Sequence, residues 1–167
     1  MQIPSGYQRI RGLAGTGKTI ILCLKAAIAH NEFPDSKILY LFNTQSLYQH
    51  IRGLISQYYI EETKGILDET KLQIRHAWGG KTAGDGLYSD TCTILNLQPI
   101  SYRNIPPGEK KNALAYIYKN LLEHIKKANV KPIYDIILID EAQDFPQELF
   151  ECFYYLTKEP RKIIWAY

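Results

Sequence analysis

The chain has 167 residues, of which 46% are hydrophobic and 22% are charged, and this balance is typical of one folded domain with its own core. No apolar stretch approaches the roughly 20 residues of a membrane helix, and the N-terminus lacks the hydrophobic core of a secretory signal. Cys23, Cys92 and Cys152 are far apart and odd in number, which favours reduced thiols in a cytoplasmic protein over disulfides or a zinc site. The net charge of +3 permits a nucleic-acid partner but does not indicate one by itself.

Strand-like and helix-like segments alternate along the first half of the chain. Residues 7–13 predict a short strand that runs into a glycine-rich turn, and residues 18–31 predict a helix that is apolar nearly all round. A second strand is predicted at 37–42, after a turn signal. Residues 45–59 have helical spacing, and residues 71–77 predict a third strand.

The second half of the chain continues the alternation after a less regular stretch. Residues 78–86 predict a loop, and the pattern of residues 88–107 favours no single assignment. The remaining predicted elements are a helix at 109–129, a strand at 136–139, a helix beginning near Pro146 and a last strand at 162–167. Strands that alternate with helices predict an α/β fold, a three-layer sandwich with a parallel sheet between two layers of helices. Residues 1–167 read as one domain.

The sequence GLAGTGKT, residues 12–19, fits the pattern of a phosphate-binding P-loop. Its glycines allow several backbone N–H groups to point at one phosphate, and the following helix directs its positive end there. The Lys18 ammonium supplies a charge for the β- and γ-phosphates, and the Thr19 hydroxyl suits Mg²⁺. The position of the motif between a predicted strand and a strong helix favours this interpretation over an ordinary glycine-rich turn.

The sequence IILIDEAQD, residues 136–144, places two acids at the end of a buried strand. Adjacent carboxylates repel one another, so a bound cation would stabilise them. Ligands of parallel α/β sheets gather at the carboxyl ends of the strands, where Asp140 could assist the Mg²⁺ that Thr19 touches. Glu141, one residue further on, could polarise a water that attacks the γ-phosphate. The alternative is an exposed acidic turn in which Asp140 or Asp144 caps the next helix.

GLAGTGKT and DEAQD together resemble motifs I and II of the UvrD/Rep-type superfamily 1 helicases. YLFNTQSL resembles motif Ia, and RHAWGGK resembles the next stretch of that family, so the likeness covers essentially the whole chain. Members of this family are P-loop NTPases with a RecA-like sheet, and they use ATP and Mg²⁺ to move along single-stranded DNA. The resemblance therefore implies an ATP-dependent helicase motor, with single-stranded DNA or RNA as the partner.

The resemblance implies a role for each matching residue. The residues that would hold phosphate and metal belong to the P-loop and are Gly12, Gly15, Thr16, Gly17, Lys18 and Thr19. Asp140 would assist the metal, Glu141 would be the catalytic base, and Gln143 would sense the γ-phosphate. Lys18, Glu141 and Gln143 would thus take part in catalysis.

The resemblance also implies contacts with nucleic acid. The residues involved follow the second and third predicted strands and are Phe42, Asn43, Thr44, His76 and Trp78. The Trp78 ring could stack on a base, because an aromatic face suits sequence-independent binding of single strands. Structural alternatives remain open: Phe42 as a core residue, Asn43 or Thr44 as a helix N-cap, and His76 as a hydrogen-bonded residue at a strand end.

Some parts of the helicase pattern are not found in this sequence. Neither the adenine-sensing glutamine upstream of motif I nor the arginines that touch the γ-phosphate can be identified. We therefore expect the chain to be the first RecA-like half of a longer two-domain motor, with residues 162–167 as a central strand. Since loss of a charge-stabilising arginine costs about 10³ to 10⁵ in rate, we expect the chain alone to bind nucleotide but hydrolyse little.

Two other classes of function are compatible with these motifs. A nucleoside kinase of the thymidine kinase type also combines a P-loop with a DEAQ sequence, but such enzymes usually carry paired CxxC zinc ligands that this chain lacks. The second alternative is a module in which nucleotide binding regulates a nuclease or another partner of a defence system.

Overall fold

A parallel sheet organises the part of the chain that the computed structural model describes, residues 3–13, 15–79 and 86–167. Its five strands lie in the order β1-β5-β4-β2-β3, and every neighbouring pair is parallel. The strands are β1 (Tyr7–Ile10), β2 (Ile38–Phe42), β3 (Leu72–His76), β4 (Tyr134–Ile139) and β5 (Thr157–Ala166).

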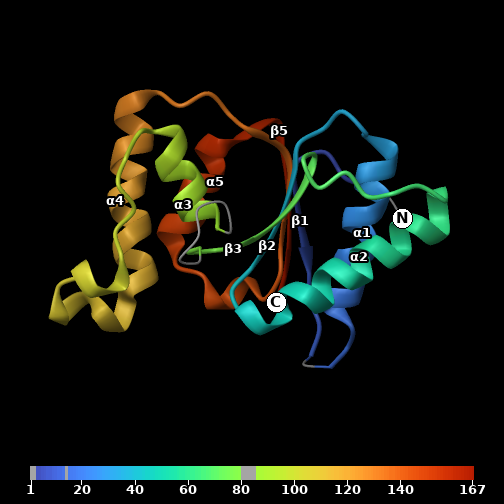
Figure 1. Cartoon of the computed structure of the whole chain (residues 1–167), viewed down its shortest axis with the longest axis horizontal. Coiled ribbons are helices and arrows are strands. Elements are labelled where there is room, and N and C mark those ends of the chain that lie inside the picture. The colour runs from blue at the N-terminus through green and yellow to red at the C-terminus, as the bar shows by residue number, and fades with distance from the viewer. Residues whose placement is uncertain (1–2, 14, 80–85) are drawn as a thin grey trace.

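Helices cover both faces of the sheet (Figure 1). One layer consists of α1 (Lys18–Glu32) and α2 (Tyr48–Thr63), and the other of α3 (Leu87–Ile94), α4 (Ala113–Ala128) and α5 (Gln147–Leu156). Each layer packs on its own cluster of buried side chains. The predicted three-layer α/β sandwich is thereby confirmed.

Of the inner strands, β2 is buried throughout and β4 is buried except at the half-buried Asp135, as their apolar sequences predict. Successive side chains of a strand point to opposite faces, so each strand contributes to both clusters. Tyr40 and Leu138 belong to the cluster under α1 and α2, whereas Leu39 and Ile139 belong to the cluster under α4 and α5. Tyr40 is paired with Leu138 across the β2–β4 ladder.

Strand β5 lies between β1 and β4, so the expectation that residues 162–167 form a central strand is confirmed. Ile163 of β5 pairs with Tyr7 on one side and with Ile137 on the other. This register brings the ends of β1 and β4 to the same edge of the sheet. The segments that follow them, which contain the two sequence motifs, therefore emerge at that edge.

The observed helices differ from the predicted ones mainly at their ends. Residues Gln45–Leu47 and Pro107–Asn112 form 3₁₀ turns before α2 and α4, so residues 45–47 and 109–112 of the two predicted helices are not α-helical. Helix α2 also continues to Thr63 and ends at Lys64, which has a left-handed conformation. Such end effects depend on packing and capping more than on the apolar period.

The stretch 88–107, for which no assignment was favoured, contains most of α3 and a 3₁₀ turn at Tyr102–Asn104. With eight residues, α3 is too short to show a clear helical period. At the other end of the chain, β1 stops at Ile10 rather than at the predicted residue 13, and β5 begins at Thr157, directly after α5. The predicted loop at 78–86 falls largely on residues 80–85, outside the described residues.

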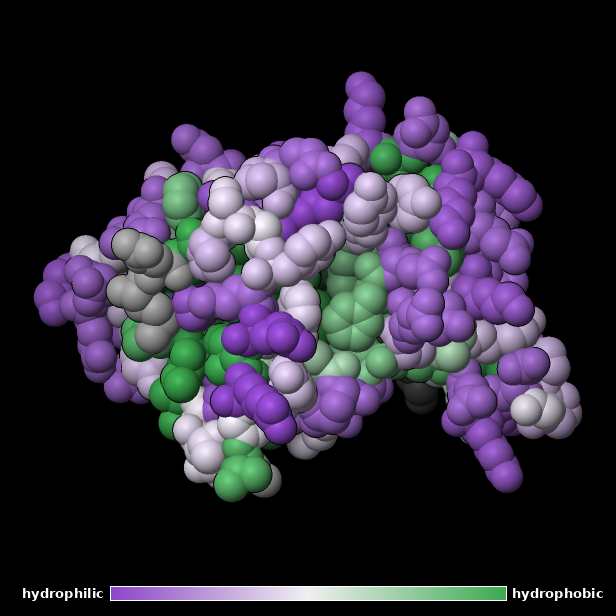
Figure 2. Space-filling model, turned by 180° about the vertical axis from the view of Figure 1, so that it is seen from behind, coloured by the Kyte–Doolittle hydropathy of each residue, from purple (hydrophilic) through white to green (hydrophobic). Residues whose placement is uncertain are grey.

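The side of the molecule opposite to the view of Figure 1 is mostly hydrophilic, with hydrophobic side chains gathered near its middle (Figure 2). None of the helices in the described part of the chain is both long enough and apolar enough to cross a membrane.

Candidate functional site

The loop between β1 and α1 has the backbone geometry of a phosphate cradle. Gly15 and Gly17 have φ angles of 79° and 80°, a left-handed conformation that glycine adopts without steric cost. A Cβ atom on Gly12 would lie 2.4 Å from the Thr16 hydroxyl oxygen, so this position also requires glycine. The Thr16 side chain and backbone N–H both donate to the Leu13 carbonyl, which closes the loop.

Helix α1 presents its positive end to this loop. It begins at Lys18, and its first turn contains no acidic residue that would compete with an anion for the free N–H groups. The Lys18 side chain is only 8% exposed, and its ammonium donates to the carbonyls of Gly12 and Leu13 at 3.1 and 3.3 Å. These contacts hold one positive charge over the loop, where a phosphate would bind.

Asp140 lies directly behind the P-loop helix, at the end of β4. Its side chain is 1% exposed and accepts hydrogen bonds from the Tyr40 hydroxyl at 3.2 Å and from the Glu141 N–H at 3.1 Å. The Thr19 hydroxyl lies near enough to stabilise the charged carboxylate. The alternative of an exposed acidic turn does not fit this carboxylate. Helix α5 is preceded by Pro146 and has no side-chain cap, so Asp140 and Asp144 do not cap it.

The electrostatics around Asp140 favour a cation. Burial raises the pKa of this carboxyl above its ordinary value, and the charge of Glu141 acts in the same direction. The Thr19 and Tyr40 hydroxyls lower the pKa again, because they stabilise the charged form. Among the residues that the structure describes, no lysine, arginine or histidine forms an ion pair with Asp140.

The donor atoms of Thr19 and Asp140 fit Mg²⁺, which prefers oxygen ligands. Within the described residues there is no cluster of three or more histidine, cysteine or acidic side chains that could hold a metal without help. The Thr19 hydroxyl and the Asp140 carboxylate are the kind of donors expected when one or two protein oxygens hold Mg²⁺ together with the phosphates of a nucleotide.

Glu141 stands at the start of the turn that follows β4. It has a φ angle of 49°, a left-handed conformation that is uncommon for a residue with a side chain and is often found at functional sites. Its carboxylate accepts a hydrogen bond of 2.7 Å from the Gln143 amide, and Gln143 itself is exposed. The structure thus brings the predicted base and the predicted γ-phosphate sensor into direct contact.

The predicted nucleic-acid residues of the second strand have different environments. The Phe42 side chain is 2% exposed and packs with the rings of Tyr48 and His76, as the alternative of a core residue describes. Contact between the Phe42 ring and nucleic acid stays a prediction, and it would require the side chain to move out of its buried position. Asn43 is half-buried and Thr44 is exposed, so these two side chains lie at the surface beside it.

His76 connects the ends of β2 and β3 through both ring nitrogens. Its Nε2 contacts the Asn43 carbonyl at 2.5 Å, and its Nδ1 accepts from the backbone N–H groups of Trp78 and Gly79. Because a carbonyl can only accept, the proton is on Nε2 and the ring is neutral. His76 therefore positions the backbone that carries Asn43 and Trp78.

Two tyrosines contribute to this edge of the molecule without having been singled out from the sequence. Tyr40 contacts Asp140, and Tyr102 lies 6.1 Å from the Trp78 ring, measured between centroids. In the sequence, Tyr40 stands out as the hydroxyl-bearing residue of an otherwise apolar strand. Because a buried hydroxyl needs a hydrogen-bond partner, this pattern indicates a polar contact inside the core. Tyr102 lies in the stretch whose structure no sequence pattern favoured.

A comparison with known protein families matches residues 8–154 to the family described as "Type III restriction enzyme, res subunit". A comparison with curated proteins found no match. The family match confirms a helicase-like P-loop NTPase domain and the RecA-like character of the sheet. The match covers the P-loop, the acidic pair Asp140 and Glu141, and the strands that precede them. The narrower assignment to UvrD/Rep-type helicases stays a prediction.

The neutral state of His76 has a consequence for stability. Burial lowers the pKa of His76 below its ordinary value of 6.5, although the hydrogen bond with Asn43 opposes this effect. The unfolded chain therefore takes up the proton first, and stability is lost as the pH falls below about 6.5 towards the pKa of the folded protein. We expect the free energy of unfolding, measured in urea, to fall between pH 7 and pH 5.

His76→Gln should show a smaller decrease, because glutamine can still donate to the Asn43 carbonyl but does not titrate. Burial also lowers the pKa of His30, so the variant should retain part of the pH dependence. An NMR titration that gives His76 a pKa above 6.5 would contradict the arrangement.

Proposed function

We propose that this chain, which belongs to the family "Type III restriction enzyme, res subunit", is the ATP-binding first motor domain of a UvrD/Rep-like superfamily 1 DNA helicase. The observation that carries this proposal is the buried Asp140 carboxylate at the end of β4, whose charged form the Thr19 hydroxyl of the P-loop helix stabilises. This proximity links the P-loop to Asp140, which supports a single site for phosphate and Mg²⁺.

In this proposal the loop at residues 12–19 binds the phosphates of ATP. The N–H groups at the start of α1 and the Lys18 ammonium would offset the negative charge of the phosphates, and Thr19 and Asp140 would hold Mg²⁺. The metal would neutralise charge that develops on the phosphates during the reaction. The preference for adenine rests on the resemblance to helicases.

Glu141 and Gln143 are the residues that we assign to hydrolysis. Glu141 directly follows Asp140 and is only half-buried, so its carboxylate could orient and deprotonate a water. Gln143 donates a hydrogen bond to this carboxylate, so a change in the contacts of Gln143 would alter the position of the Glu141 base. We infer that Gln143 passes the state of the nucleotide on to the rest of the motor.

Coupling of this cycle to movement would require a second RecA-like domain in a longer protein. ATP bound between two such domains draws them together, and hydrolysis releases them. The family match supports this division of labour, because helicase-like motors are built from paired domains of this kind. We propose that residues 1–167 correspond to one member of the pair.

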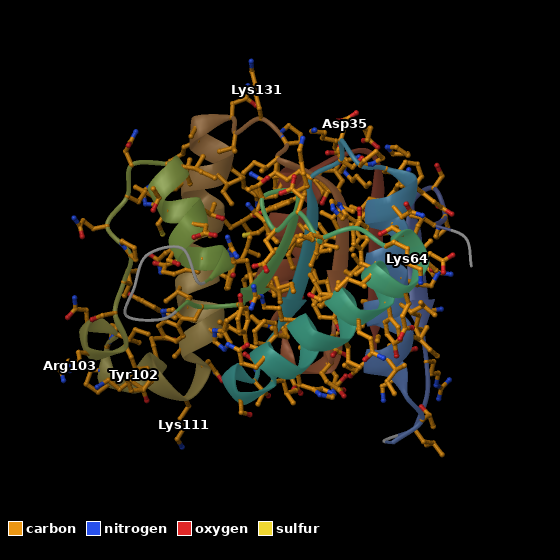
Figure 3. The ribbon with its side chains drawn as sticks, turned by 45° about the vertical axis from the view of Figure 1, so that its right-hand side comes forward. Asp35, Lys64, Tyr102, Arg103, Lys111 and Lys131 are labelled. Atoms are coloured by element: carbon orange, nitrogen blue, oxygen red, sulfur yellow. The ribbon has the colours of Figure 1, made fainter. Side chains whose placement is uncertain are left out.

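The proposed path of single-stranded DNA crosses the same edge of the sheet as the nucleotide site. Thr44, Asn43 and Trp78 follow the carboxyl ends of β2 and β3. Figure 3 shows Tyr102, Arg103 and Lys111 projecting at this end of the molecule, away from Asp35 and Lys131.

The side chains at this end suit a flexible nucleic-acid strand. The Tyr102 side chain is 55% exposed, and the Lys110 ammonium lies 5.5 Å from the centre of its ring. Aromatic faces next to cations suit the bases and phosphates of a single strand.

The nucleotide site can be tested by calorimetric titration with ATP and Mg²⁺. We expect binding that Lys18→Ala and Asp140→Ala each weaken by about 10-fold to 100-fold, because hydrogen bonds to charged groups contribute roughly 1.5 to 3 kcal/mol. Matched controls are Lys119→Ala and Asp35→Ala, which remove the same charges from exposed positions and should leave the affinity unchanged. Equal affinity of the unmodified chain and both site variants would contradict a common site for phosphate and metal.

The nucleic-acid surface can be tested with a fluorescent oligothymidylate at fixed salt concentration. Trp78→Leu keeps an apolar side chain against the core but removes the stacking face, which is worth about 1 to 3 kcal/mol per base. We expect the anisotropy titration to show weaker binding by about 5-fold or more. Tyr154→Leu removes an exposed aromatic ring from α5 and serves as the control. Unchanged binding by Trp78→Leu would exclude stacking there, and an RNA oligomer would establish the preferred nucleic acid.

A further inference from the structure

Tyr40 places a hydroxyl group inside a strand whose other side chains are apolar. The strand reads Ile-Leu-Tyr-Leu-Phe, and Tyr40 is fully buried. A buried hydroxyl without a partner destabilises a protein, whereas phenylalanine would fill nearly the same volume without this cost. The reason for a tyrosine rather than a phenylalanine at this position must therefore lie in the hydrogen bonds of its hydroxyl.

Those contacts link the P-loop helix to the acidic pair. The Tyr40 hydroxyl donates to Oδ2 of Asp140 at 3.2 Å, and the Cys23 thiol donates to the Tyr40 oxygen at 3.5 Å. Cys23 comes four residues after Thr19 in α1, so both side chains lie on the same side of that helix. Through Cys23 and Tyr40, the helix that carries Thr19 is thus linked to Asp140 by hydrogen bonds inside the core.

Both oxygens of the Asp140 carboxylate are held by this arrangement. Oδ1 accepts from the Glu141 N–H at 3.1 Å, while Oδ2 accepts from Tyr40. Two fixed oxygens determine how the plane of the carboxylate is turned. Because the Glu141 N–H holds only Oδ1, the Tyr40 hydroxyl fixes Oδ2 and thereby helps to select one orientation of the carboxylate.

We propose that Tyr40 is a positioning residue that holds the Asp140 carboxylate in the orientation required to bind Mg²⁺ with ATP. This inference rests on the proposed function of the nucleotide site. Tyr40 has no access to the nucleotide, because its side chain lies under α1, so it acts only through Asp140. Residues that orient a metal ligand in this way typically change metal affinity about 10-fold to 100-fold when they are replaced.

Tyr118 is a matched control within the same chain. Like Tyr40 it is fully buried, and its hydroxyl donates a hydrogen bond of 2.6 Å to the Ala77 carbonyl. It belongs to the cluster on the other face of the sheet, and its hydrogen-bond and ring partners within the described residues are Ala77, Cys152 and Tyr88, not Asp140 or Glu141. Tyr118→Phe therefore removes a buried tyrosine hydroxyl in the same way as Tyr40→Phe, without affecting Asp140 directly.

The experiment measures ATP affinity by calorimetry over a range of Mg²⁺ concentrations and also in EDTA. Circular dichroism establishes that Tyr40→Phe and Tyr118→Phe are folded. For Tyr40→Phe we expect the Mg²⁺ concentration at half-maximal enhancement of binding to rise about 10-fold, with ATP affinity in EDTA unchanged. For Tyr118→Phe we expect neither quantity to change.

Two results would overturn the role of Tyr40: an unchanged Mg²⁺ dependence in Tyr40→Phe, or equal shifts in both variants, which would indicate general loss of stability. A loss of ATP affinity in EDTA would also contradict it, because the effect would then not pass through the metal. If the unmodified chain bound ATP without any Mg²⁺ dependence, the proposed metal site itself would be wrong, and with it the function of Tyr40.

Discussion

The proximity of the Thr19 hydroxyl to the Asp140 carboxylate, whose charged form it stabilises, is the interaction on which the candidate site depends. It connects the first turn of α1 with the end of β4, two segments that are far apart in the sequence. Neither residue alone would make a metal site. Together they offer two oxygen atoms next to a loop that is shaped for phosphate, with Lys18 held over that loop.

The order of the strands makes this contact possible. Because β5 pairs with both β1 and β4, the P-loop and the acidic pair leave the sheet at the same edge, separated by one strand. The same edge carries the turns after β2 and β3, which His76 ties together. In the proposed function, nucleotide and nucleic acid bind to neighbouring segments at this one edge of the sheet.

Much of this arrangement could be predicted from the sequence, but only where a feature is determined by residues that are close together in the chain. The glycines at 12, 15 and 17 and the acids after a buried strand report on backbone geometry and charge at their own positions. The Tyr40 contact could not be predicted, because it depends on the register between β2 and β4. The short helix α3 contains too few residues for its period to be read, and the tautomer of His76 is set by backbone groups of two different turns.

A crystal structure of the chain with Mg²⁺ and a non-hydrolysable ATP analogue would test the central claim most directly. The account predicts a metal ion about 2.1 Å from the Thr19 hydroxyl oxygen, next to the Asp140 carboxylate, with the terminal phosphates under the Lys18 ammonium. A nucleotide bound elsewhere on the molecule, or a metal ion away from Thr19 and Asp140, would contradict it.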